Sequence, residues 1–200
     1  MAPDLKVSRG TLLASAPDLQ DPNFMHTLSL ICEHTDEGAY GLVLNKRSSL
    51  TLDRLLPDHP ILGKARLPVG WGGPVHSDTL QLIHRFPQHI PGGVALGGDL
   101  QIGGELDAAA ELLRSDPSPD TLRGVRFILG CAGWGAHQLE SELAGGSWLP
   151  LPLDTELVFR TWSIEDDTQR EQEETWQLAL RGLGSEGEGL ASLPPDIEWN

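Results

Sequence analysis

The chain has 200 residues, enough for one large domain or two small ones that bury roughly 70% of the extended surface. It carries 14 Lys and Arg against 29 Asp and Glu, a formal charge of −15, which repels a phosphate backbone and argues against direct DNA or RNA binding. Its apolar runs are far shorter than the ~20 residues of a membrane span. With two isolated cysteines, Cys32 and Cys131, and no apparent secretory leader, we expect a cytoplasmic protein that does not engage a membrane.

The first quarter of the chain predicts strands joined by short turns. Strands are expected over residues 8–19, Phe24–Glu33 and Ala39–Asn45, where β-branched, aromatic and aliphatic residues concentrate. The polar loop His34–Gly38 would join the second and third of these strands as an antiparallel pair. A short helix is expected between Ser48 and Pro60, because leucines recur there at helical spacing.

The middle of the chain alternates between glycine-rich and regular segments. Val69–Val75 contains three glycines and predicts a turn rather than regular structure. Strands are expected at Leu80–His84 and Val94–Asp99. A helix is expected at Glu105–Leu113, whose apolar side chains fall on one face.

The second half centres on a strand, a turn and a helix in direct succession. Arg123–Leu129 predicts a strand, Gly130–Gly135 a tight turn with three glycines, and Gln138–Leu143 a helix with leucines at i and i+4. Leu157–Phe159 predicts one more short strand. Glu171–Leu183 predicts a final amphipathic helix.

The order of these elements indicates the fold class. Several strand pairs precede the first long helix, and helices follow without strict alternation, which favours an α+β fold over a doubly wound parallel sheet. The sequence contains neither a repeat nor a linker, so we expect a single domain over residues 1–184. The tail 185–200, rich in Gly and Ser at its start, is expected to be loosely ordered.

Four ordered blocks of residues carry a family resemblance. They are Gly10–Leu13 with Ala16–Leu19 and Asp21–Phe24; Glu33-His34 with Gly38–Asn45; Gly72–Val75; and Gly133-Trp134 with Gln138–Glu140 and Glu142. Through them the chain resembles the YqgE/AlgH family of bacterial proteins over residues 10–184. The resemblance implies a single α+β domain with a strongly bent, mostly antiparallel sheet that forms a pseudo-barrel flanked by helices.

For function the resemblance implies little. The family is largely uncharacterised, and its transcriptional-regulator label comes from a proposed role in the control of alginate production. Two positions depart from the family pattern: Cys131 stands where a tyrosine is common, and Lys46-Arg47 replaces the usual Arg-Pro. If the tyrosine hydroxyl has a role elsewhere in the family, Cys131 cannot supply it.

One candidate ligand site is the hairpin with Glu33, His34 and Asn45. If these residues face the turn with Gly72 and Gly73, they could bind a polar ligand. Equally, Glu33 and His34 could end a strand in a hydrogen-bonded loop, and Asn45 could cap the edge through backbone bonds. Neither H-x₃-H nor C-x₂-C spacing occurs, so we predict neither a metal nor a cofactor.

A second candidate ligand site is the glycine turn with Gly133, Trp134, Gln138 and Glu140. Exposed amides at the start of a helix can hold an anion. The turn lacks the Gly-Lys-Ser/Thr of a phosphate loop, and close packing around Trp134 is the alternative. Glu140 and Glu142 point in different directions on a helix, and Glu140 could pair with Arg126.

The same turn offers a possible nucleophile. A thiolate at Cys131 could be stabilised by helix amides, with His137 as its base. The alternative is a buried, structural cysteine. Three functions therefore stay open: a non-enzymatic protein that binds a partner or small ligand, with a possible regulatory outcome, which the sequence favours; a small hydrolase or transferase using Cys131 and His137 or Glu33 and His34; and a regulator acting on DNA.

Overall fold

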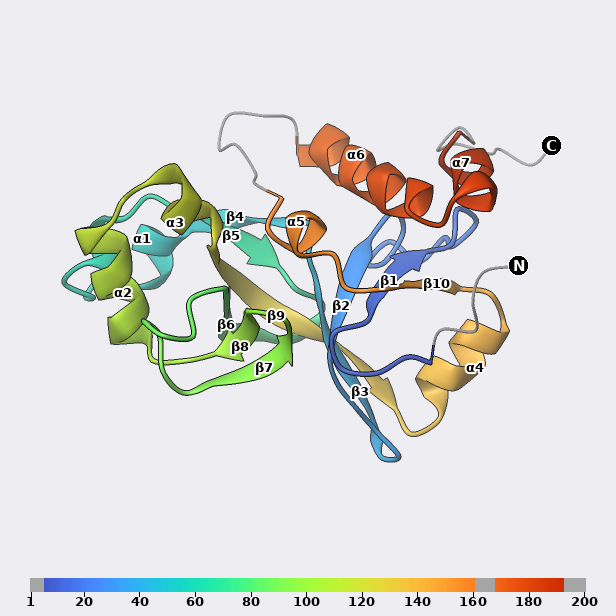
Figure 1. Cartoon of the computed structure of the whole chain (residues 1–200), viewed down its shortest axis with the longest axis horizontal. Coiled ribbons are helices and arrows are strands. Elements are labelled where there is room, and N and C mark those ends of the chain that lie inside the picture. The colour runs from blue at the N-terminus through green and yellow to red at the C-terminus, as the bar shows by residue number, and fades with distance from the viewer. Residues whose placement is uncertain (1–5, 161–167, 193–200) are drawn as a thin grey trace.

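The fold is organised around one long central strand, β9 (Val125–Gly135). In this computed structural model, which describes residues 6–160 and 168–192, β9 pairs along one edge with β6 and along the other with β5 and then β3. Its pairing with β5 is parallel, whereas its pairings with β3 and β6 are antiparallel. The strand therefore belongs to both halves of the molecule and joins them (Figure 1).

The strands form one open, mostly antiparallel sheet with the order β10-β1-β2-β3-β9-β6-β8-β7, and β4 joins it through β5. Besides β9, the strands are β1 (Leu12–Ser15), β2 (Leu28–Thr35), β3 (Gly38–Val43), β4 (Arg47–Thr51), β5 (Pro68–Trp71), β6 (Val75–His84), β7 (Gly93–Gly97), β8 (Leu100–Gly103) and β10 (Trp148–Leu151).

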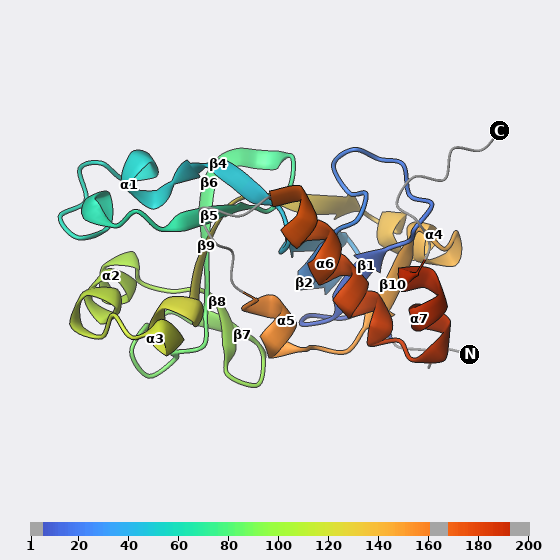
Figure 2. The ribbon, with the colours of Figure 1, turned by 90° about the horizontal axis from the view of Figure 1, so that it is seen from above.

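The helices cover the two halves separately, as Figures 1 and 2 show: α1, α2 and α3 lie on the half with β4 to β8, whereas α4, α6 and α7 lie on the half with β1, β2 and β10. The helical elements are α1 (Leu52–Leu55), the 3₁₀ helix η1 (Leu62–Lys64), α2 (Leu106–Ser115), α3 (Pro119–Arg123), α4 (Gln138–Ala144), α5 (Thr155–Val158), α6 (Thr168–Arg181) and α7 (Ser185–Ala191). Among the described residues, no helix is both long and apolar enough to cross a bilayer.

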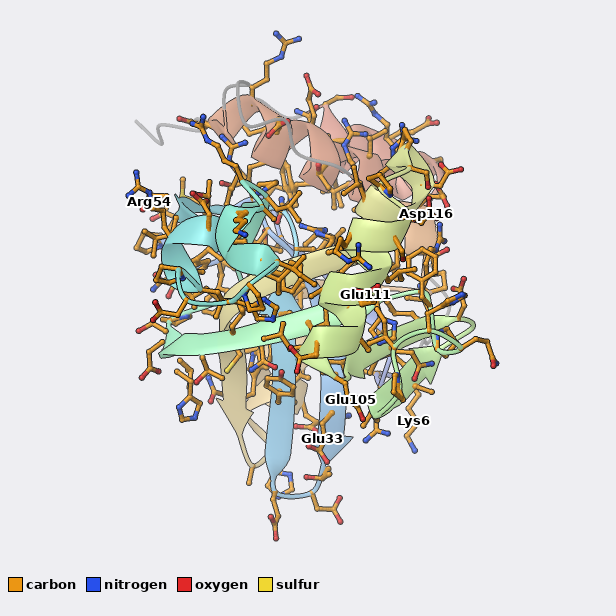
Figure 3. All side chains as sticks on the ribbon, turned by 90° about the vertical axis from the view of Figure 1, so that its left-hand side faces the viewer. Lys6, Glu33, Arg54, Glu105, Glu111 and Asp116 are labelled. Carbon is orange, nitrogen blue, oxygen red and sulfur yellow. The ribbon has the colours of Figure 1, made fainter. Side chains whose placement is uncertain are left out.

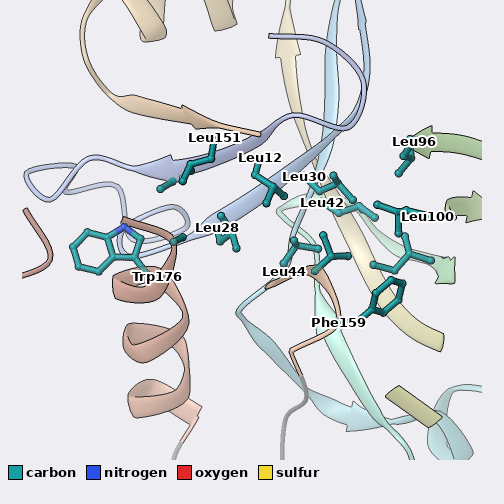
Figure 4. Close-up of a cluster of buried hydrophobic side chains, with 14 of the residues drawn as sticks. Leu12, Leu28, Leu30, Leu42, Leu44, Leu96, Leu100, Leu151, Phe159 and Trp176 are labelled. Carbon is teal, nitrogen blue, oxygen red and sulfur yellow. The ribbon is translucent and has the colours of Figure 1, made fainter. Parts of the chain in front are cut away.

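The main core lies between α6 and the strands β1, β2 and β3. Trp176 of α6 is buried against leucines of these strands, and its indole nitrogen donates to the Ser15 carbonyl at 2.9 Å (Figure 4). A second core packs α1 and α2 onto the other half of the sheet, and a third surrounds Trp134 and Trp148 beside α4. Apolar burial on both halves therefore holds the central strand in place.

Several predicted elements are confirmed. The segments Phe24–Glu33 and Ala39–Asn45 pair antiparallel as β2 and β3, and the α+β class with a bent, mostly antiparallel sheet flanked by helices is correct. The helix predicted at Glu105–Leu113 is α2, and the final amphipathic helix is α6. The tail 185–200, which we expected to be loosely ordered, instead begins with helix α7 (Ser185–Ala191), and residues 193–200 lie outside the described residues.

Three predicted elements are wrong. Gly130–Gly135 is not a turn, because β9 stays extended through Gly135. Val69–Val75 is not irregular throughout, since Pro68–Trp71 forms β5 and Val75 begins β6. Leu157–Phe159 is not a strand: the Asp154 side chain accepts hydrogen bonds from the amides of Glu156 and Leu157 and starts helix α5 instead.

Candidate functional site

The structure brings two predicted site residues, His34 and Glu140, into direct contact. His34 Nε2 lies 2.7 Å from Glu140 Oε1, and His34 Nδ1 lies 3.1 Å from the Val7 carbonyl oxygen. Both ring nitrogens thus face an acceptor oxygen, and in either neutral tautomer one of them can donate. The contact joins the end of β2 to α4. The predicted pairing of Glu140 with Arg126 is therefore wrong, because Glu140 pairs with His34 instead.

Trp134 and Gln138 belong to a second cluster centred on Glu142. Glu142 Oε2 accepts from the indole nitrogens of Trp134 at 2.9 Å and Trp148 at 2.7 Å, while Oε1 accepts from Gln138 at 2.8 Å. Phe24 packs against both indoles. Every polar atom of the carboxylate is engaged, so this cluster fixes α4 to β9 and β10. The two buried indoles, each needing an acceptor, are the sequence signal that points to Glu142.

Gly72 and Gly73 lie where the chain between β5 and β6 crosses β9. A Cβ atom on Gly72 would collide with the Gly130 carbonyl oxygen, and one on Gly73 with that of Cys131. Gly73 also has φ of 144°. These glycines permit close backbone approach, and they lie apart from Glu33, which is exposed toward the lower end of the β2–β3 hairpin in Figure 3. Gly133 is an exposed position of β9 opposite Tyr40.

Cys131 and His137 are held apart by the extended end of β9. From Cys131 to Gly135 the strand rises by roughly 13 Å at ~3.3 Å per residue, and His137 lies beyond it at the exposed start of α4. Burial raises the pKa of the Cys131 thiol, whose residue is 4% exposed. A thiolate nucleophile with His137 as its base is therefore not favoured by this geometry.

Asn45 is buried and holds three segments together. Its Oδ1 accepts from the Leu28 amide at 2.8 Å, and its Nδ2 donates to the carbonyls of His26 and Gln172, each at 2.9 Å. Gln172 in turn donates to the Met25 carbonyl at 3.1 Å. These bonds fix α6 against the loop that precedes β2, and they shape the cavity beside it.

That cavity, which we call the Lys46 pocket, has a volume of about 480 Å³. Its polar lining residues include Asn23, His26, Lys46, Arg47, Gln172 and Glu173, and Trp71 forms an aromatic wall. The Lys46 ammonium donates to the carbonyls of Pro22 and Asn23, each at 2.9 Å, and lies 5.3 Å from the Trp71 ring centre. Burial lowers the pKa of Lys46, whereas Asp21 acts in the opposite direction.

A second hollow, which we call the Arg126 pocket, has a volume of about 200 Å³ and lies between α3, the start of β9 and the residue after α5. Arg126 donates to the carbonyls of Val158 and of Leu44, the latter at 2.7 Å. Sequence reasoning singled out Lys46-Arg47 only as a departure from the family pattern and Arg126 only as a partner for Glu140. Neither pocket was predicted, because each joins segments far apart in sequence.

Among residues 6–160 and 168–192, three or more His, Cys, Asp or Glu side chains are nowhere gathered in a way that could hold a metal ion. The anion cradle considered for Gly130–Gly135 has no helical amides of its own, because these residues are a strand. The predicted site residues thus do not meet in one site. His34 contacts Glu140, Trp134 and Gln138 bond to Glu142, Gly72 and Gly73 pass close to β9, and Asn45 shapes the Lys46 pocket, whereas Glu33 and Gly133 are exposed.

Known proteins share sequence and fold with this chain. Residues 12–188 match the family described as DUF179, AlgH-like. The chain belongs to the AlgH-like family. It is 37% identical to a UPF0301 protein of Anaeromyxobacter dehalogenans over 89% of each chain, and 34% identical to one of Thioalkalivibrio sulfidiphilus over 86% of this chain and 87% of the relative.

Two solved structures share the AlgH-like fold. The solution structure of the AlgH protein from Pseudomonas aeruginosa is 28% identical, with a TM-score of 0.63 over 88% of this chain and 93% of that protein. A crystal structure of a protein from Corynebacterium diphtheriae, 20% identical, has a TM-score of 0.73 over 94% of each chain and shows the likeness of fold alone. The family is uncharacterised, so function is argued from the pockets.

Proposed function

We propose that this AlgH-like protein is a non-enzymatic binding protein that takes up a small anionic ligand, a carboxylate or a phosphate, in the Lys46 pocket. The observation that carries the proposal is the position of the Lys46 ammonium in the pocket wall. An ammonium has three N–H donors, and carbonyl oxygens of Pro22 and Asn23 accept two of them. A ligand oxygen would accept the third N–H of Lys46.

The charge of Lys46 is held in an environment that favours an anion. Two peptide carbonyls and the Trp71 ring contact the ammonium, and Asp21 is the acidic group that acts on its pKa. Partial burial weakens solvation of the ammonium, which strengthens its interaction with an incoming negative charge. In a chain of net charge −15, Lys46 and Arg47 bring two basic side chains to the described lining of this pocket, against one carboxylate, that of Glu173.

The pocket is also held in shape before any ligand arrives. Asn45 and Gln172 both bond to the His26 carbonyl, and His26 packs its ring 4.5 Å from that of Trp176 in the core. Lys46 in turn fixes the loop at Pro22 and Asn23. Walls fixed by buried hydrogen bonds lower the entropy lost on binding.

The free, buried thiols of Cys32 and Cys131 are consistent with a protein of the reducing cytoplasm.

The test is anion binding by the purified chain, with inorganic phosphate, citrate and adenosine monophosphate as probes, measured by calorimetry at constant ionic strength. The key variant is Lys46→Met, which keeps the length of the side chain and removes its charge. Lys64→Met is the matched control, because Lys64 is exposed on η1 and does not line the pocket.

We expect at least one probe to bind the natural chain and Lys64→Met equally, and Lys46→Met about 10- to 100-fold more weakly. This range corresponds to one charge-assisted hydrogen bond. Equal binding by Lys46→Met and the natural chain would place the anion elsewhere. Absence of binding by all three probes at millimolar concentration would contradict the proposal as well.

A further inference from the structure

The Arg126 pocket differs in chemistry from the Lys46 pocket, and the two share no lining residue among those the structure describes. Its walls are apolar: they include Leu67, Leu122, Val125, Phe127 and Phe159. Arg123 and Arg126 supply its charged groups, and none of its described lining residues is acidic. Apolar walls with a few polar groups are the usual composition of a small-molecule site.

Arg126 is held rigidly at this pocket. The residue is 8% exposed, and its two terminal guanidinium nitrogens donate to the carbonyls of Val158, in α5, and Leu44, the residue after β3. Burial lowers the pKa of Arg126 to about 9, so the guanidinium stays charged at neutral pH. A guanidinium fixed in a plane by two bonds is pre-organised to orient a carboxylate.

The remaining walls are fixed as well. Phe127 is 2% exposed on β9, and Phe159 is 5% exposed with the Arg85 guanidinium 5.1 Å from its ring centre. Leu122, by contrast, is 40% exposed on the last turn of α3 and lies beside Arg123, whose guanidinium is 3.9 Å from Asp120. Leu122 and Arg123 are therefore the solvent-accessible side of an otherwise buried hollow.

We propose that the Arg126 pocket binds a small carboxylic acid with an apolar chain or ring. The apolar part would contact Val125, Phe127 and Phe159, and the carboxylate would lie toward the guanidinium groups of Arg126 and Arg123. A volume of about 200 Å³ is below the ~300–1,000 Å³ of pockets for drug-sized ligands, which restricts the ligand to a short chain or a single ring. A polypeptide segment is too large for it.

The probe for this site is 3-phenylpropanoate, and 3-phenylpropan-1-ol is the matched neutral compound with the same ring and chain. Binding is measured by calorimetry and by chemical-shift changes of the Val125 and Leu122 methyl groups. We expect the acid to bind at least tenfold more tightly than the alcohol and to shift both methyl signals. Equal affinities would overturn the proposal, because apolar contact alone would then account for binding.

The matched variants are Leu122→Glu and Leu122→Gln, which place side chains of equal size at an exposed position and differ only in charge. We expect Leu122→Glu to bind 3-phenylpropanoate several-fold more weakly than Leu122→Gln, since its carboxylate would repel the ligand. Arg123→Gln should also weaken binding, whereas Lys64→Met, at an exposed residue that lines neither pocket, should leave it unchanged. Equal binding by the two Leu122 variants would show that the acid binds outside this pocket.

Discussion

The imidazole of His34 and the carboxylate of Glu140 lie 2.7 Å apart although 106 positions separate them in the chain. The pair connects the end of β2 to the first turn of α4, and the second ring nitrogen of His34 reaches the Val7 carbonyl. His34 therefore connects β2, helix α4 and the segment at Val7 through its two ring nitrogens.

Glu140→Gln tests this connection through pH. The amide of Glu140 itself and then the hydrogen bond from His34 hold the pKa of this carboxyl below its usual range. A carboxyl with a depressed pKa adds stability above its unfolded pKa, and the addition is lost as the pH falls through the lower, folded pKa. The natural chain should thus have a slightly higher urea midpoint than Glu140→Gln at pH 7, and this difference should shrink as the pH falls below the ordinary carboxyl pKa of about 4.5. The control Glu37→Gln, at the exposed hairpin turn, should match the natural chain throughout; a Glu140→Gln difference independent of pH would contradict the ion pair.

Glu142→Ala should be far more destabilising. It removes the acceptor shared by the indoles of Trp134 and Trp148, both of which are buried. An unsatisfied buried donor costs about 1–3 kcal/mol, so the free energy of unfolding should fall by at least that amount. Urea denaturation measures the loss, and Glu37→Ala should change it by less than ~0.5 kcal/mol. A near-neutral Glu142→Ala would mean that water replaces the carboxylate.

The same cluster shows what sequence reasoning reached and what it missed. The periodicity of α2 and α6 and the β-rich segments of β2 and β3 are local signals, and those elements were predicted correctly. Gly130, Gly133 and Gly135 were interpreted as a turn, because glycine is common in turns. In the fold Gly130 has φ of 75° and approaches the backbone of Gly72 and Gly73, while the strand continues through Gly135. A contact between segments so far apart in the chain produces no periodic pattern in the local sequence, so the sequence does not predict it.

For the candidate sites too, the sequence indicates single residues of interest but not the distant residues that they contact. Asn45 and Glu140 could be selected as polar residues of interest, but their partners, Gln172 and His34, depend on how distant segments meet. Arg126 is predicted from the sequence only as an arginine that Glu140 could pair with. It bonds instead to carbonyls of Val158 and Leu44, which the bend of the sheet and helix α5 bring to it.

The two cysteines provide a chemical test of the non-enzymatic interpretation. Burial raises the pKa of both Cys32 and Cys131, so little thiolate forms at neutral pH. In Cys32→Ala, which isolates the second thiol, we expect Cys131 to react with iodoacetamide at pH 7 at least roughly tenfold more slowly than the unfolded chain does. Mass spectrometry of timed samples measures the rate. A native rate equal to that in urea would indicate an activated thiol and return the hydrolase or transferase hypothesis to consideration.

His84 predicts how the fold responds to mild acid. The imidazole is completely buried, and its Nδ1 accepts a hydrogen bond from the Phe86 amide at 3.1 Å, which requires the neutral ring. Burial lowers the pKa of His84, and a hydrogen bond with the Gly103 backbone acts in the opposite direction. The unfolded chain therefore binds a proton near pH 6.5 that the folded chain does not, and the free energy of unfolding falls as pH drops below that value, by at most about 1.4 kcal/mol per pH unit.

In His84→Asn the side-chain oxygen can still accept from Phe86, but it does not titrate. We expect this variant to be less stable than the natural chain at pH 8, because the smaller side chain leaves space unfilled, and the difference to shrink between pH 6.5 and 5. Urea denaturation at closely spaced pH values measures both curves. Parallel curves for the two proteins would show that the pKa of His84 is the same in the folded and unfolded chain, and that the acid response arises at another group.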